Sequence, residues 1–266
     1  MVILRNEFHM GTDKILCLVT GPSGSGKSSI ALELQKQLFV TTNTNGQQVS
    51  VVEVIHQDHY FTKPFLPYKE RVDDSFENSS GIDWDCLLAD VDSKLAGAAS
   101  RSNEDDNCPE KKHCFNSDAS TTIVIVEGHL LGDVASLFRQ KFSGVSILVI
   151  LLVNCSQESC KQRRLDRRKD RSEDERNELT NYIDDFVWPS FLKYGVDAMN
   201  ALRQNFSGTT TTRQATQQTS EDSKQQCGLQ YLEANNILIE IDNSDSASLE
   251  KNVDKISNLV HNILSD

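Results

Sequence analysis

The residues Gly21-Pro-Ser-Gly-Ser-Gly-Lys27-Ser28 have the types and spacing of a P-loop, which binds a polyphosphate. Such a loop must point successive backbone N–H groups at the phosphate oxygens, and glycine lets the chain turn that tightly. Lys27 is expected to reach the outer phosphates, and the Ser28 hydroxyl is expected to hold Mg²⁺. The pattern predicts a nucleotide site made of Gly21, Pro22, Ser23, Gly24, Ser25, Gly26, Lys27, Ser28 and Ser29.

Two acidic residues follow runs of apolar or β-branched residues that are typical of strands. Asp58 lies just after residues 49–55, and Glu127 directly follows residues 121–126. Ligands of open α/β sheets collect beyond the carboxyl ends of strands, so both carboxylates are expected near bound ligand. Asp58 could accept a proton from a substrate hydroxyl or support the metal, and Glu127 fits the acidic partner of a magnesium site. The alternatives are that Asp58 caps a turn and that Glu127 is an exposed loop residue.

Residues 161–171 are rich in Lys and Arg within an acidic chain. On a helix, Arg163 and Arg167 would share one face, as would Arg164 and Arg168. Such a cluster repels itself unless an anion is bound. It could form a lid, at about residues 160–180, that closes over a triphosphate and neutralises charge on the transferred group. The alternative is a solvated charged surface.

Aromatic residues stand beside acidic ones in two further segments. Asp83 and Asp85 could cap a helix that begins near Cys86. Trp84, next to a carboxylate, could instead stack on a substrate ring beside an acceptor for sugar hydroxyls. Residues 182–194 predict a helix that breaks at Pro189, with Trp188 in the core.

The elements that must position these residues form a regular series. Strands are expected at 15–19, 49–55, 121–126, 146–153 and 236–241, and helical stretches alternate with them. This alternation predicts an α/β fold with a mainly parallel central sheet flanked by helices in three layers. We expect one domain over residues 1–266, with polar insertions at about 98–120 and 204–228 and a final helix at about 247–264.

Composition limits the classes of function. The 266 residues carry a formal net charge of −12, which is opposite to the balance of proteins that bind nucleic acid by neutralising phosphates. The seven cysteines are scattered and odd in number, which favours reduced thiols in the cytosol. Residues 1–10 lack the apolar core of a signal peptide, and the apolar run at 145–153 is too short to cross a bilayer. We therefore expect a cytoplasmic protein, with the nucleus as an alternative, and no nucleic-acid or membrane partner.

Taken together, the motifs resemble those of the nicotinamide riboside kinases, relatives of uridine kinase. The resemblance rests on GPSGSGKSS, QDHYFTKP at 57–64, DWD at 83–85, IVEGHLL at 125–131, CKQRRLDRR at 160–168 and YIDDFVWPSFLKY at 182–194. It implies a P-loop NTPase fold and transfer of the γ-phosphoryl of ATP, with Mg²⁺, to the ribose 5′-hydroxyl of nicotinamide riboside. Nicotinic acid riboside is a further candidate substrate.

The resemblance also implies roles for individual residues. Asp58 would be the proton acceptor at the metal, and Lys27 would act on the phosphates. Trp84 would stack on the base and Asp85 would hold the ribose hydroxyls. The remaining implied positions are the metal ligands Ser28, Asp58 and Glu127, the substrate turn His59, Tyr60 and Phe61, and the lid arginines Arg163, Arg164 and Arg167.

The sequence departs from that family at two of these places. His59 stands where Asp is frequent, and Lys169 stands where some members offer a tyrosine to the nicotinamide ring. Base specificity is therefore open, and uridine or cytidine kinase is the alternative among enzymes. A regulator that binds ATP without transferring it is a third possibility, whereas a GTPase would carry an N-K-x-D run that the sequence lacks. We expect a monomer or a weak homo-oligomer whose partner is a small nucleoside.

Overall fold

The computed structural model describes residues 14–44, 49–96, 121–207, 228–232, 236–244 and 251–258. Its six-stranded sheet has the order β2-β3-β1-β4-β6-β5. The strands are β1 Lys14–Thr20, β2 Val49–His56, β3 Thr121–Gly128, β4 Ile147–Asn154, β5 Gly228–Leu232 and β6 Asn236–Asp242. All neighbouring strands are parallel except β5, which pairs antiparallel with β6. The predicted α/β fold with a mainly parallel sheet is confirmed.

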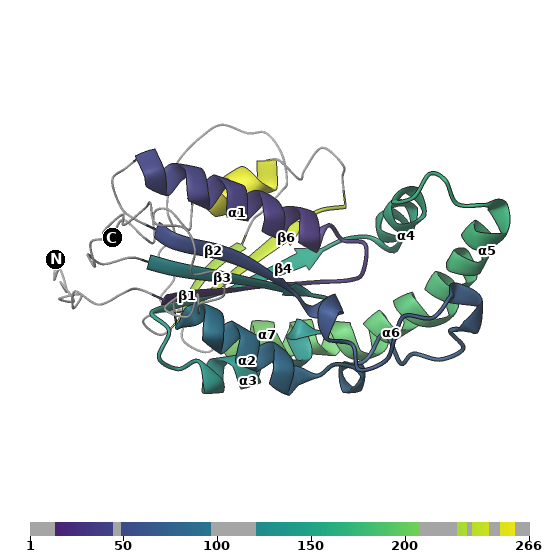
Figure 1. Cartoon of the computed structure of the whole chain (residues 1–266), viewed down its shortest axis with the longest axis horizontal. Coiled ribbons are helices and arrows are strands. Elements are labelled where there is room, and N and C mark those ends of the chain that lie inside the picture. The colour runs from purple at the N-terminus through teal and green to yellow at the C-terminus, as the bar shows by residue number, and fades with distance from the viewer. Residues whose placement is uncertain are drawn as a thin grey trace, which may run out of the picture.

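Helices cover both faces of this sheet (Figure 1). Helix α1 (Lys27–Thr44) and the helical residues 251–258 lie on one face, and α2 (Trp84–Leu95), α3 (Leu131–Lys141) and α7 (Val196–Ser207) lie on the other. Successive residues of a strand point to opposite faces. In β1, Ile15 and Cys17 accordingly pack in the core under α1, and Leu16 and Leu18 pack in the core under α2 and α3.

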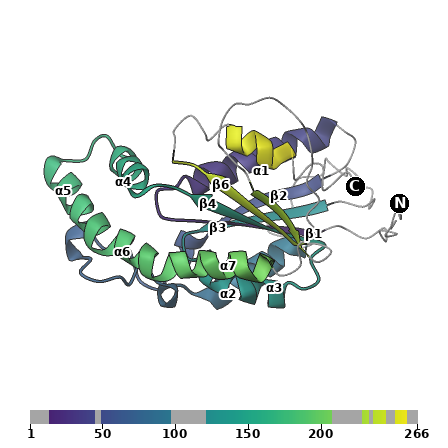
Figure 2. The same ribbon diagram turned by 180° about the vertical axis from the view of Figure 1, so that it is seen from behind.

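Three further helices stand beyond the carboxyl ends of the strands. These are α4 (Gln157–Asp166), α5 (Glu173–Tyr182) and the short α6 (Trp188–Ser190), and they curve away from the sheet in both views (Figures 1 and 2). Helix α5 begins with a capping box between Ser172 and Glu175, which satisfies two free backbone donors. Helices α4, α5 and α6 therefore project from the sheet on the side where its parallel strands end.

The predicted helix break at Pro189 is wrong. The chain is helical from Glu173 through Ser207, and π-helical turns at Ile183–Val187 and Phe191–Gly195 lie on either side of α6. Proline lacks a backbone donor and crowds the preceding turn. The wider π turns change the hydrogen-bonding pattern around this position, so the helix continues through the proline.

Some expectations fall on parts of the chain outside the described residues. These are most of the two polar insertions, namely residues 97–120 and 208–227, and both ends of the predicted C-terminal helix. The second insertion is predicted to begin at residue 204, but α7 continues to Ser207. Among the described residues, no helix is both long and apolar enough to span a membrane.

Candidate functional site

The loop between β1 and α1 takes a conformation that requires glycine. Gly24 and Gly26 have φ angles of 93° and 94°, in the left-handed region. A Cβ added to Gly24 would lie 2.5 Å from the Cys160 carbonyl oxygen, and one added to Gly26 would lie 2.6 Å from Nδ2 of Asn243. Close packing by α4 and by the end of β6 therefore holds this turn, and its glycines serve both the backbone conformation and the close approach.

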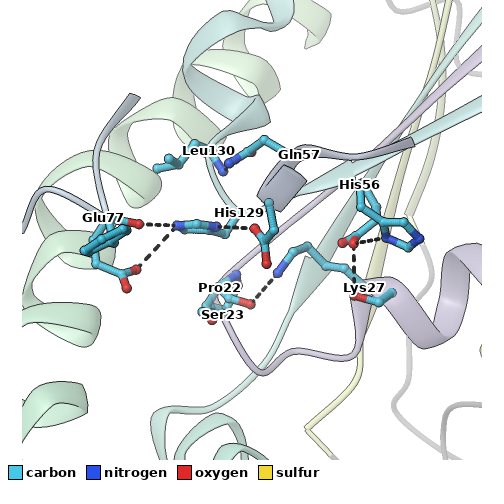
Figure 3. A network of polar contacts seen from close by, with 12 residues as sticks. Pro22, Ser23, Lys27, His56, Gln57, Glu77, His129 and Leu130 are labelled. Atoms are coloured by element: carbon cyan, nitrogen blue, oxygen red, sulfur yellow. Dashed lines mark hydrogen bonds and ion pairs between the residues drawn. The ribbon is translucent and has the colours of Figure 1, made fainter. Parts of the chain in front are cut away.

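Lys27 lies inside this loop. Its Nζ donates a hydrogen bond to the Pro22 carbonyl oxygen at 2.9 Å, and its side chain is buried (Figure 3). Burial lowers the pKa of Lys27, and the negative charges of Glu127 and Asp58 oppose that shift. The loop thus holds an ammonium group close to two carboxylates.

Ser28 and Glu127 meet where β1 and β3 end. Ser28 Oγ donates to Glu127 Oε1 at 3.0 Å, and His56 Nδ1 lies 2.7 Å from the same oxygen. Parallel pairing explains this meeting, because Glu127 is in register with both Val19 of β1 and His56 of β2. Glu127 is 5% exposed, so it is not the exposed loop residue that the sequence left as an alternative.

Ser28 and Glu127 form a suitable oxygen pair for Mg²⁺. Mg²⁺ prefers oxygen ligands and is usually held by one or two carboxylates together with the phosphates of the substrate. Among the described residues, no cluster of three or more His, Cys, Asp or Glu side chains could hold a metal by itself. The donors present therefore fit an ion that binds together with a nucleotide.

Asp58 lies on the 3₁₀ turn Gln57–Tyr60 that follows β2, and its side chain is 61% exposed. The turn is attached to the loop after β3, because Gln57 Oε1 accepts from the Leu130 N–H at 3.0 Å. Asp58 Oδ1 lies 3.9 Å from Nδ1 of His129 (Figure 3). The carboxylate is thus held at the sheet edge while it still faces solvent.

A buried carboxylate supports His129 from its other side. His129 Nε2 lies 3.2 Å from the Phe76 carbonyl oxygen and 3.4 Å from Glu77 Oε2. Glu77 is 7% exposed, and its Oε1 accepts from the Tyr182 hydroxyl at 3.0 Å. These contacts join the 61–81 segment, the end of β3 and helix α5. Sequence reasoning gave no role to His129, although it lies in the quoted segment 125–131, or to Glu77, because their contact joins residues 52 positions apart.

Replacing Glu77 with glutamine tests this chain of contacts. Burial disfavours the charged form, but the hydrogen bond and charge of His129, the charge of Arg164 and the Tyr182 hydroxyl together hold the pKa of Glu77 below its ordinary value of 4.5. A carboxylate with a depressed pKa stabilises the fold above its unfolded pKa and loses that effect as the pH falls through the folded value. In urea unfolding we expect E77Q to lower the free energy of unfolding by about 1–3 kcal/mol at neutral pH and by less at about pH 3. A larger loss of unfolding free energy at about pH 3 than at neutral pH would contradict a stabilising, ionised Glu77 carboxylate.

The residues expected to contact substrate lie together around the start of α2. The Asp83 N–H donates to the Tyr60 carbonyl oxygen at 2.8 Å, and Phe61 forms a β-bridge with Ile82. Asp83 also caps α2, accepting from the Cys86 N–H at 3.0 Å, as the sequence predicted.

The side chains of this group differ in their freedom to meet a ligand. Tyr60 donates its hydroxyl to Asp90 at 2.6 Å, and the half-buried Trp84 donates its indole N–H to the Ser79 carbonyl at 2.8 Å. Both aromatic side chains also pack against the core under α2. Phe61 belongs to an aromatic group with Phe65 and Phe76. Exposed side chains are found at His59 and Asp85.

The basic segment does not act as a single surface. The Nη1 of Arg164 donates to Ser23 Oγ at 2.6 Å, and the Nη1 of Arg163 lies 3.4 Å from the Ser25 carbonyl oxygen. Both side chains therefore reach the phosphate loop, and Arg164 is only 9% exposed. Arg167 is exposed at the C-cap of α4.

The other arginines have structural contacts. Arg171 Nη1 donates to the Arg164 carbonyl at the end of α4, and Arg168 pairs with Asp170 at 3.2 Å. The expectation that Arg164 and Arg168 share a helix face is wrong, because α4 ends at Asp166. Arg163 and Arg164 therefore do not fit the alternative of a solvated charged surface for this segment.

The family assignment follows from the match of the chain to a family model. A model described as an AAA domain matches residues 17–184, which include the phosphate loop, Glu127 and α4. The chain belongs to the AAA domain family. This match and the sheet order give the chain the α/β fold of P-loop NTPases.

Individual relatives of this AAA domain protein are distant. A uridine kinase from Deinococcus deserti is 28% identical over 115 residues, which are 41% of this chain and 50% of that protein. The chain thus spans about half the length of that relative. A solved gluconokinase from Sinorhizobium meliloti 1021 has a TM-score of 0.30 and 17% identity over 74% of this chain and 98% of its own. A deoxyadenosine kinase from M. mycoides has a TM-score of 0.25 and 15% identity over 71% and 86%.

Proposed function

We propose that this protein is a nucleoside kinase that transfers the γ-phosphoryl of ATP to the ribose 5′-hydroxyl of nicotinamide riboside, giving nicotinamide mononucleotide. The observation that carries the proposal is the position of Asp58, which lies on the same sheet edge as Lys27, Ser28 and Glu127 and acts electrostatically on Lys27. A carboxylate beside a phosphate loop is suited to receive the proton of an acceptor alcohol. Nicotinic acid riboside is proposed as a second acceptor.

Phosphoryl transfer needs mainly positioning and neutralisation of charge. Lys27 and the loop N–H groups would bind the phosphates, and Arg163, Arg164 and Arg167 would add positive charge from the side of α4. Ser28, Glu127 and Asp58 would hold Mg²⁺, which supplies charge neutralisation when it is bound. The buried position of Lys27 strengthens its effect on an anion, because water screens it less.

On the acceptor side, Asp58 would take the hydroxyl proton as the new bond to phosphorus forms. The contact of Gln57 with Leu130 and the nearby ring of His129 limit where the turn can move. His59, Tyr60 and Phe61 would form the wall of the nucleoside site next to this turn. Trp84 would present a ring face to the base, and the exposed Asp85 would hold ribose hydroxyls. We expect this reaction to take place in the cytoplasm.

A panel of nucleosides tests the substrate. With ATP and Mg²⁺ in a coupled assay, we expect faster turnover of nicotinamide riboside than of uridine or cytidine at equal concentration. The 28% identity to a uridine kinase favours a pyrimidine nucleoside as the second candidate. Faster turnover of uridine would reject the proposed base and keep the kinase, whereas ATP binding without any transfer would favour the regulator.

Trp84→Ala tests the stacking role. Loss of an aromatic pair costs about 1 kcal/mol, so the KM for the nucleoside should rise about fivefold while the KM for ATP changes little. Trp84→Phe is the matched variant, because it keeps a ring although it cannot donate to Ser79. Equal changes in both KM values after Trp84→Ala would show that the indole only supports the fold.

A further inference from the structure

Two cysteines lie directly behind the phosphate loop. Cys155 follows the last residue of β4, and Cys160 is in the second turn of α4, where it is 2% exposed. Ser156 is the N-cap of α4, so Cys155 just before it and Cys160, the fourth residue of the helix, hold the two positions whose side chains pack against each other at a helix start. The backbone of Cys160 also packs on Gly24, where an added Cβ would lie 2.5 Å from its carbonyl oxygen. A change in this thiol pair would therefore act close to the loop.

Cys155 is connected to the loop through two further residues. Its thiol donates to the Asn243 carbonyl oxygen at 3.5 Å, and the side-chain amide of Asn243 donates to the Ser25 carbonyl oxygen at 2.7 Å. The Nη1 of Arg163 lies 3.4 Å from Cys155 Sγ and 3.4 Å from the same Ser25 oxygen. The Ser25 carbonyl is thus held by two groups that both contact Cys155.

The surroundings of Cys155 favour its thiolate, which is the reactive form of cysteine. The hydrogen bond from Cys160 is the largest influence, and with Arg163 and Lys27 it lowers the pKa of Cys155 to about 7 against the opposing effects of burial and Asp242. Cys155 is only half-buried, so a small oxidant can reach it. Cys17, by contrast, is fully buried, and burial raises its pKa to about 12.

We propose that Cys155 is a modification site for hydroperoxides, and that its oxidation leads to a disulfide with Cys160 that weakens nucleotide binding in the loop. In the first step the Cys155 thiolate attacks hydrogen peroxide, which gives a sulfenic acid and releases hydroxide. The Cys160 thiol then attacks this sulfur, forming the disulfide and releasing water. The two thiols together lose two electrons and two protons, and the peroxide is reduced to two molecules of water.

The second step becomes easier after the first. The hydrogen bond to Cys155, burial and the charge of Cys155 raise the pKa of Cys160. A sulfenic acid carries no such charge at neutral pH, so its formation removes one cause of this shift. In the disulfide, Cys155 has neither a thiol hydrogen to donate to the Asn243 carbonyl nor a negative charge to attract Arg163. Both residues that hold the Ser25 carbonyl would then lose or weaken a contact with Cys155, and the effect on nucleotide binding rests on the function proposed above.

Peptide mapping tests the modification without any assay of activity. The full chain is treated with hydrogen peroxide, its free thiols are alkylated, and it is cleaved at Glu158, which lies between the two cysteines. We expect the resulting fragments to remain joined by a Cys155–Cys160 disulfide until dithiothreitol is added. Cys86 is the internal control, because it is more exposed than Cys155. Oxidation of Cys86 at an equal or faster rate, or no link between the fragments, would overturn the proposal.

Titration of ATP and Mg²⁺ by calorimetry tests the effect on the loop. We expect the oxidised protein to bind ATP about tenfold more weakly than the reduced protein, with recovery after dithiothreitol. Cys155→Ser should make the affinity insensitive to peroxide, whereas Cys86→Ser should leave the response unchanged. If the disulfide-linked and reduced forms bound ATP with equal affinity, the proposed effect of the disulfide on nucleotide binding would be overturned. If the reduced chain bound no ATP, the proposed function and the coupling would both fail, and the mapping would still decide the disulfide.

Discussion

Lys27→Ala is expected to lower kcat at least about a hundredfold, because it removes the buried ammonium that would face the transferred phosphoryl group. The fold should survive. The side chain makes one hydrogen bond, to the Pro22 carbonyl, and burial already disfavours its charge. Steady-state kinetics with saturating ATP and nicotinamide riboside would measure the loss, and circular dichroism would show that the variant is folded.

Two controls separate charge from shape in this experiment. Lys27→Met keeps much of the side-chain volume without the charge, so it should be as inactive as Lys27→Ala. Lys36→Ala removes an exposed lysine from α1 that is paired with Glu33, and it should leave kcat within about twofold of the wild type. Substantial activity in Lys27→Met would contradict the electrostatic role of Lys27.

Asp58→Ala is expected to lower kcat by about 10²–10⁴-fold, the range typical for loss of a positioned general base. Asp58→Asn should show a similar loss, because the amide keeps the shape and cannot take the proton. The side chain is 61% exposed, so neither change should lower the melting temperature appreciably. Asp92→Asn makes the same chemical change on the exposed face of α2 and should have no effect. Near-normal kcat in Asp58→Ala would show that the base is assigned wrongly.

The sequence was sufficient for elements whose signal is local. The phosphate loop has fixed spacing, and each of the five parallel strands is a short apolar run, so β1, β2, β3, β4 and β6 were predicted within one or two residues at each end. Strand β5 was missed because its five residues take their place from antiparallel pairing with β6. The π turns around Pro189 were missed because a proline predicts a break unless the surrounding packing extends the helix.

The candidate site shows the same division. The P-loop motif predicted the place of Lys27 and Ser28, and the end of a predicted strand predicted the place of Glu127, whereas the strand order that brings them together came from the structure. The contact of His56 with Glu127 joins residues 71 positions apart and depends on the register of β2 against β3. The chain from Tyr182 through Glu77 to His129 joins three separate segments, so no local pattern could indicate it.

The most direct test of the central claim is a crystal structure with an unreactive ATP analogue, Mg²⁺ and nicotinamide riboside. The proposed mechanism predicts that a carboxylate oxygen of Asp58 lies within hydrogen-bond distance, about 2.6–3.2 Å, of the ribose 5′-hydroxyl oxygen. A structure in which Asp58 points away from both the metal and the nucleoside would contradict it.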